Sequence, residues 1–133
     1  MRIWHIDLIP YLPRTQLLAQ WRELNSIFKK QDKHILINYI YDYPTFDALY
    51  TYSNYVMSEM LIRGYTVKTH NQIEFFKDKK LTGNMRFKEH DREYLTICYY
   101  NLKEKYLRGQ KGFTKDTWEK LNKFYKIQLG IGD

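Results

Sequence analysis

Few side chains in this sequence follow patterns that are known to support catalysis. No two histidines stand four residues apart, and no cysteine–histidine spacing resembles a zinc site; the histidines are His5, His34, His70 and His90. Glycine-rich phosphate loops and glycine-flanked serine nucleophiles are also absent. The sequence therefore predicts no metal site and no cofactor, and it excludes the familiar hydrolase motifs.

The remaining candidate is a carboxylate, Glu23, which follows Arg22 in an amphipathic segment. This segment begins after Pro13, and its apolar residues recur at helical spacing: Leu17, Leu18, Trp21, Leu24 and Phe28. The pattern predicts a helix over residues 14–30. At about 100° per residue, Glu23 points away from the apolar stripe, and so do Gln16, Ala19 and Gln20. Judged from the residues alone, Glu23 is an ordinary solvated carboxylate.

The composition favours a nucleic-acid partner. Of the 133 residues, 17% are aromatic, with 13 Tyr, and the net charge is +7. Cations attract phosphates and aromatic rings stack on bases, although a basic domain with tyrosine-rich packing would have the same composition. Residues 1–62 carry six basic and six acidic side chains, whereas residues 63–133 carry sixteen basic and nine acidic ones. The attraction to a polyanion thus originates in the second half.

The lone cysteine and the hydropathy give an expected location. Cys98 has no partner for an intramolecular disulfide, and in its helix-like setting we expect a buried, inert thiol. No apolar run approaches the roughly 18 residues that a membrane span needs, and the N-terminus lacks the apolar region of a signal peptide. We therefore expect a cytoplasmic protein without a membrane partner.

The elements that position these residues are predicted to be helical. Residues 1–12 look extended, 34–43 form a short helix or an irregular segment, and 65–88 form a loop with one short helix. A second helix follows Pro44 and Thr45 and ends near Gly64. Asp91 and Thr114 are N-cap candidates for two further helices, the first of which Gly109 closes. The sum is a compact, monomeric all-α domain of about four helices that spans residues 1–133, with an extended N-terminal segment.

The first predicted helix carries a recognisable sequence motif. The segment from Leu17 to Leu24 reads Leu-Leu-Ala-Gln-Trp-Arg-Glu-Leu. It resembles the first-helix motif of the pyrimidine-dimer DNA glycosylase/AP lyase family, which is a leucine, two residues, an acidic or amide residue, an aromatic residue, and Arg-Glu-Leu. Further pieces are similar to the family in the same order, and they cover most of the chain: Arg2-Ile3, Lys33-His34-Ile35, Arg63-Gly64-Tyr65, Lys68, His90, Leu102-Lys103-Glu104-Lys105 and the stretch 113–125.

The resemblance implies a compact helical fold and a specific chemistry. In the family the nucleophile is the α-amine of the chain, a group whose ordinary pKa of about 7.7–8.0 leaves a useful neutral fraction near pH 7. It attacks C1′ of the damaged nucleotide, displaces the base and leaves a protonated imine. A glutamate stabilises the positive charge and assists removal of the C2′ proton, so that the strand breaks by β-elimination. Glu23 is the residue that matches this glutamate.

The resemblance also implies the partner, which is double-stranded damaged DNA. The expected DNA contacts come from Arg2, Gln16, Arg22, Lys68 and Lys105. Because residue 2 is a bulky arginine, we expect Met1 to be retained and to supply the amine. We expect this amine near the Glu23 carboxylate, at one end of a cleft that Arg2 and Arg22 line.

Three positions depart from the family pattern. Gln16 replaces a histidine, and Ser26 and Asn101 replace arginines. Fewer cations would weaken the grip on phosphates. Two functional hypotheses therefore stay open: a glycosylase/AP lyase that acts on damaged DNA, or a non-catalytic nucleic-acid-binding helical domain that has kept the fold but lost the excision activity. A purely structural interpretation, a basic tyrosine-rich bundle, stands beside these two.

Overall fold

Helices form all the regular structure in residues 1–130, which are the residues that the computed structural model describes. This range contains five α-helices and two short 3-10 helices, and no strand occurs in it. The all-α prediction is confirmed. In chain order the elements are η1 (Ile6–Tyr11), α1 (Arg14–Lys30), η2 (Asn38–Tyr41), α2 (Asp47–Ile62), α3 (His70–Phe76), α4 (Arg92–Leu107) and α5 (Lys115–Gln128).

Four helix ends lie where local sequence signals predict them, although α2 begins at Asp47 rather than directly after Thr45. The Asp91 side chain accepts a hydrogen bond from the Tyr94 amide at the start of α4, and Thr114 accepts one from Thr117 at the start of α5. Gly64, with φ at +88°, follows α2, and Gly109, with φ at +78°, follows α4. Only glycine adopts this left-handed conformation without strain, so these two residues stop their helices efficiently.

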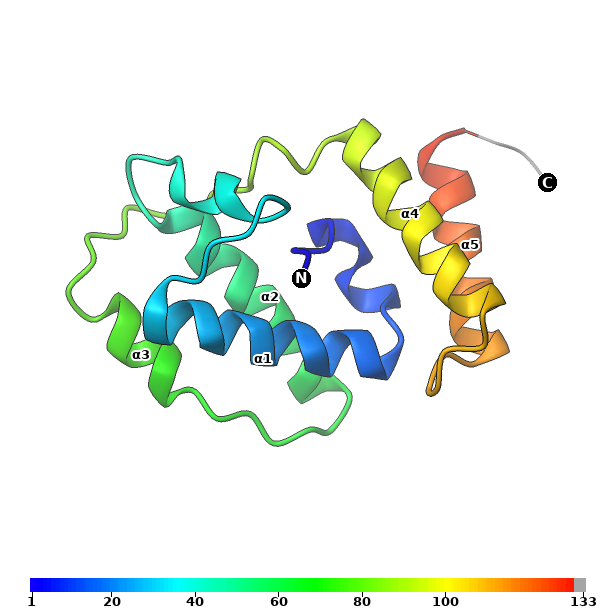
Figure 1. The fold of residues 1–133 in the computed structure, drawn as a ribbon, viewed down its shortest axis with the longest axis horizontal. Coiled ribbons are helices and arrows are strands. Elements are labelled where there is room, and N and C mark those ends of the chain that lie inside the picture. Colours follow the sequence, from blue (N-terminus) through cyan, green and yellow to red (C-terminus); the bar gives the residue numbers. More distant parts are fainter. Residues whose placement is uncertain (131–133) are drawn as a thin grey trace.

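The N-terminal segment is the central element of the fold. Figure 1 shows helices α1, α2 and α3 on one side and the antiparallel pair α4 and α5 on the other, with residues 1–12 between the two groups. Its helix η1 contacts both α2 and α5. The segment is mostly buried, and its fully buried side chains include Ile3, Leu8 and Leu12. The hydrophobic core of the molecule is therefore built around the start of the chain.

Part of this segment forms a 3-10 helix, whereas the sequence predicts an extended chain over residues 1–12. Residues 6–11 form η1, which begins where the His5 ring nitrogen Nδ1 accepts a hydrogen bond from the Asp7 amide over 3.1 Å. Pro10 lies inside η1 and the chain is extended again at Leu12. The 3-10 helix makes the segment shorter than an extended chain, and the segment lies between the two helix groups.

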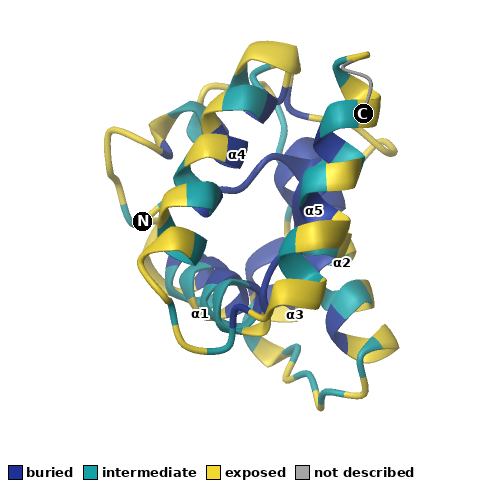
Figure 2. Cartoon of the chain, turned by 90° about the vertical axis from the view of Figure 1, so that its right-hand side faces the viewer, coloured by how far each residue is buried: buried dark blue, intermediate teal, exposed yellow. Residues whose placement is uncertain are grey.

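Much of the aromatic content serves packing between α4 and α5. The Tyr99 and Tyr125 rings stack at 3.7 Å between centroids, and Tyr99 also stacks on Trp118. The Phe113 and Trp118 ring centroids lie 6.3 Å apart, and these residues precede the N-cap Thr114 by one and follow it by four, which is the spacing of a hydrophobic staple. Figure 2 shows the buried sides of the helices turned toward the interior. A high tyrosine count is thus explained in part without nucleic acid.

The surroundings of Cys98 and the lengths of the helices bear on two further expectations. Cys98 is fully buried, and burial raises the pKa of its thiol, as expected for an inert residue. No helix in the described part of the chain is both long and apolar enough to cross a membrane.

Candidate active site at the chain terminus

Gln20 of α1 fastens the start of the chain to the helix that carries Glu23. Its side-chain oxygen accepts a hydrogen bond from the Trp4 amide over 2.9 Å, and its amide nitrogen donates to the Arg2 carbonyl over 3.1 Å. The hydroxyl of Tyr94 in α4 donates to the Ile3 carbonyl over 2.6 Å. Residues 2–4 are therefore held from both sides, which fixes where Met1 emerges.

Met1 and Glu23 line the same pocket. This pocket has a volume of about 360 Å³, and it is lined by Met1, Arg2, Trp4, Gln16, Ala19, Glu23, Leu36, Asn101 and Lys105. Five of the seven predicted site residues are therefore in one place. They come from the N-terminal segment, from α1 and from α4, which are far apart in the sequence.

The environment of Glu23 is partly desolvated and positively charged. Loss of solvent raises the pKa of the Glu23 carboxyl, and the positive charges of the chain terminus, Arg22 and Lys105 oppose this shift. The Gln20 side-chain nitrogen donates a hydrogen bond to Glu23 Oε2 over 3.1 Å. Glu23 is thus an oriented carboxylate that is more basic than a solvated one, which is the property a proton acceptor needs.

Arg2 is held over two aromatic rings at the edge of this pocket. Its guanidinium carbon lies 5.8 Å from the centroid of Trp4 and 5.9 Å from that of Tyr94. These cation–π contacts orient the side chain while its charge stays partly accessible. A cation in this position suits a phosphate that flanks a nucleotide in the pocket.

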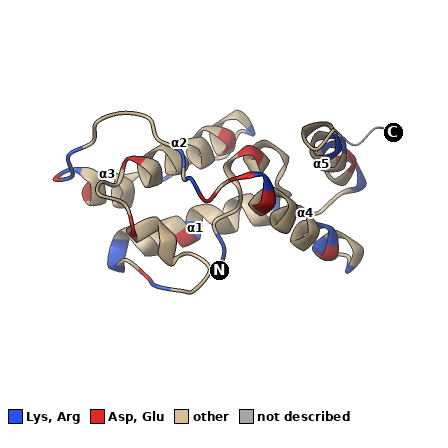
Figure 3. Cartoon of the chain, turned by 90° about the horizontal axis from the view of Figure 1, so that it is seen from above, with Lys and Arg blue, Asp and Glu red and all other residues tan. Residues whose placement is uncertain are grey.

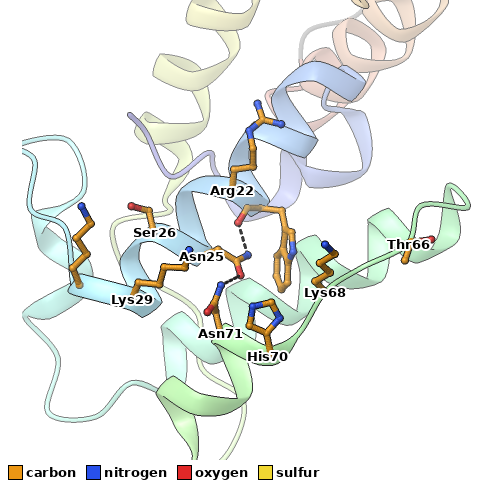
Figure 4. Close-up of a pocket in the computed structure, with 10 residues that line it drawn as sticks. Arg22, Asn25, Ser26, Lys29, Thr66, Lys68, His70 and Asn71 are labelled. Atoms are coloured by element: carbon orange, nitrogen blue, oxygen red, sulfur yellow. Dashed lines mark hydrogen bonds between the residues drawn. The ribbon is translucent and has the colours of Figure 1, made fainter.

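Arg22 and Lys68 belong to a different pocket, contrary to the expectation that Arg22 would share a cleft with Arg2. This second pocket has a volume of about 580 Å³ and is lined by ten residues, of which four are cationic: Arg22, Lys29, Lys30 and Lys68. Figure 4 shows its lining residues coming from α1 and from the segment that leads into α3. Residues 22 and 23 are neighbours on one helix, but their side chains diverge. The predicted cleft is therefore divided into two pockets along α1.

The second pocket is shaped by two asparagines. Asn25 donates a hydrogen bond to the Trp21 carbonyl over 2.8 Å, and Asn71 of α3 donates to the Asn25 side-chain oxygen over 2.9 Å. Ser26, which replaces a family arginine, also lines this pocket. Arg22 and three lysines also line it, so the pocket attracts an anion.

The burial of Gln20 is not apparent from the sequence. Helical periodicity placed it away from the apolar stripe, yet its side chain is fully buried. The reason is that the N-terminal segment covers this face of α1. Asn101 was singled out only as a replaced arginine, and it lines the pocket with Met1 and Glu23.

His90 has a structural position rather than a catalytic one. Its Nδ1 accepts a hydrogen bond from the Ile6 amide, and its Nε2 lies 2.7 Å from the Tyr39 hydroxyl. Burial lowers the pKa of the His90 imidazole to about 3, so the ring is neutral at physiological pH. In residues 1–130 no cluster of three or more His, Cys, Asp or Glu side chains could hold a metal ion.

One comparison with known proteins finds a match. A family model described as pyrimidine dimer DNA glycosylase matches residues 1–72. The matched part includes the N-terminal segment, α1 and Lys68, whereas Asn101, Lys105 and the resemblances noted in the C-terminal half lie outside it. No curated protein and no solved structure matches the chain significantly.

Proposed function

The chain belongs to the pyrimidine dimer DNA glycosylase family, and from this premise we propose that it is a glycosylase and AP lyase that acts on damaged duplex DNA. Its substrates are pyrimidine dimers or abasic sites. The observation that carries the proposal is the presence of Met1 and Glu23 in one pocket, which is also lined by a cationic residue of the N-terminal segment, Arg2, and one of α4, Lys105.

In this proposal the α-amine of Met1 is the nucleophile. Its lone pair attacks C1′ of the damaged nucleotide, and the base leaves with the electrons of the glycosidic bond. The nitrogen then loses a proton and its lone pair forms a double bond to C1′, while O4′ leaves with the C1′–O4′ electrons and takes up a proton, so that the opened sugar carries a protonated imine. The carboxylate of Glu23 stabilises this positive charge, because opposite charges attract strongly in a partly desolvated pocket.

Glu23 then completes strand cleavage. It accepts a proton from C2′, the C2′–H electrons form a double bond to C3′, and the 3′ phosphate leaves with the C3′–O electrons. A carboxylate whose pKa is raised accepts this proton more readily, provided that it is ionised at working pH. The nearby positive charges favour the ionised form.

Borohydride trapping tests the proposal. Abasic duplex DNA is incubated with the protein and borohydride, and the linked peptide is identified by mass spectrometry, which also shows whether the chain starts at Met1. We expect the DNA to be attached to the N-terminal peptide. Acetylation of the amine should abolish both trapping and strand cleavage while DNA affinity is nearly unchanged.

Two variants separate the roles of the residues. Glu23→Gln should bind abasic DNA but not cleave it, because an amide cannot accept the C2′ proton. Glu119→Gln on α5 is the control and should cleave normally, because its side chain is exposed and does not line the pocket. An adduct on a lysine would refute the assignment of Met1. DNA binding without any adduct would favour the non-catalytic hypothesis.

A further inference from the structure

An exposed isoleucine stands beside the candidate active site. Ile35 lies in the loop between α1 and η2, and 87% of its surface is accessible to solvent. The next residue, Leu36, is also exposed and lines the pocket that contains Met1 and Glu23. Figure 1 shows this loop passing close to the N-terminus. An apolar tip is therefore presented to solvent at the mouth of the pocket.

The turn that carries Ile35 is well fixed by hydrogen bonds. The His34 carbonyl accepts from the amides of Ile37 and Asn38 over 2.8 and 2.9 Å, and the Asn38 side chain accepts from the His34 amide over 2.8 Å. Just after the turn, Ile37 is fully buried in the core. Just before it, the Tyr41 hydroxyl donates to the Asp32 carbonyl. Ile35 is thus held outward by an anchored turn rather than by a loose loop.

The charges around Ile35 suit a duplex. Lys33 is exposed two residues before it, and Arg2 and Lys105 line the adjoining pocket. Cations of this kind position phosphates, whereas an apolar side chain among them has no phosphate to bind. Proteins that open a duplex place such an apolar residue between adjacent base pairs, where it replaces the lost stacking.

We propose that Ile35 is a wedge that enters the base stack next to the target nucleotide. The inference rests on the proposed function, because the amine of Met1 must reach a C1′ atom that a stacked duplex shields. Burial of Ile35 between base pairs compensates for the unstacking, and the opened step lets the nucleotide approach the pocket. Ile35 is a positioning residue in this proposal and takes no part in bond making.

The test compares duplex and single-stranded abasic DNA of the same sequence. Borohydride trapping by Ile35→Ala should fall about tenfold or more on the duplex, because the isoleucine side chain no longer replaces the lost stacking. Trapping on the single strand should be unchanged, because there is no stack to open. Ile35→Leu should restore most of the duplex activity. Ile62→Ala is the control, because Ile62 is 79% exposed at the end of α2 and distant in sequence from the site.

A second measurement needs binding only. A 2-aminopurine base beside the abasic site should brighten when the wild-type protein unstacks it and should stay quenched with Ile35→Ala at saturating protein. Equal brightening by both proteins, or an equal loss of trapping on both DNA forms, would overturn the wedge. Absence of any adduct with the wild type would instead refute the proposed function, and the 2-aminopurine signal would still decide the role of Ile35.

Discussion

Gln20 joins the start of the chain to the helix of the candidate site. Besides its bonds to Trp4, Arg2 and Glu23, its side-chain oxygen lies 2.9 Å from the Tyr52 hydroxyl. Gln20→Leu would leave the buried Trp4 amide without this acceptor and would remove the bonds to Arg2 and Glu23, so we expect the free energy of unfolding to fall by about 1–3 kcal/mol. Urea unfolding measures this loss, and Gln128→Leu at the exposed end of α5 should change little. Equal stability of the two variants would mean that the Gln20 network contributes nothing.

The charge of Glu23 has a cost in stability that depends on pH. Burial raises the pKa of its carboxyl in the folded protein. Between the unfolded and folded pKa values the folded state binds more protons, so this residue's contribution to stability falls as pH rises through that window. Glu23→Gln has no charge to desolvate. We therefore expect its stability relative to the wild type to increase from about pH 4 toward pH 7. Thermal unfolding across this range measures the difference, and a gap that does not change with pH would contradict it.

Among the elements, α1 connects the core to both pockets. One of its sides buries Leu17, Leu24 and Ile27, and Trp21 is only 7% exposed. Trp21→Ala should therefore lower the free energy of unfolding by about 3–5 kcal/mol. Leu107→Ala on α4, at a side chain that is 71% exposed, is the matched control and should cost under about 1 kcal/mol. A similarly small effect at Trp21 would show that the indole does not support the core.

Elements that are formed by interactions between residues close in the sequence could be predicted, whereas features that depend on distant residues could not. The bounds of α1 agree with the prediction over 14–30, because its apolar spacing is local. The caps at Asp91 and Thr114 are local as well. The 3-10 helix η1 and the burial of Gln20 depend on contacts with residues far along the chain. Periodicity states which side of a helix a residue occupies, and it does not state what covers that side.

At the scale of the molecule, the net charge is a weak guide to the DNA-binding surface. Most of the excess positive charge is in the second half of the sequence, yet several cations there are paired with acidic residues one turn away. Examples are Lys115 with Glu119, Lys120 with Asp116 and Arg108 with Glu104. Figure 3 shows basic and acidic residues on the same helices in this part of the chain. The pockets along α1 gather cations from both halves instead.

The salt dependence of DNA binding distinguishes the cations of the two pockets along α1 from the cations of the C-terminal helices. Each phosphate contact contributes about 0.9 to the slope of log affinity against log salt concentration, because binding releases condensed counterions. We expect Arg22→Gln and Lys105→Gln each to lower the slope for abasic duplex DNA by about that amount, because they line separate pockets. Lys123→Gln, on the exposed side of α5 and outside both pockets, should leave the slope unchanged.

Fluorescence anisotropy at several salt concentrations measures the slope for all three variants. Affinity that does not respond to salt would reject DNA as the partner, and a lower slope for Lys123→Gln alone would move the contact surface to the C-terminal helices.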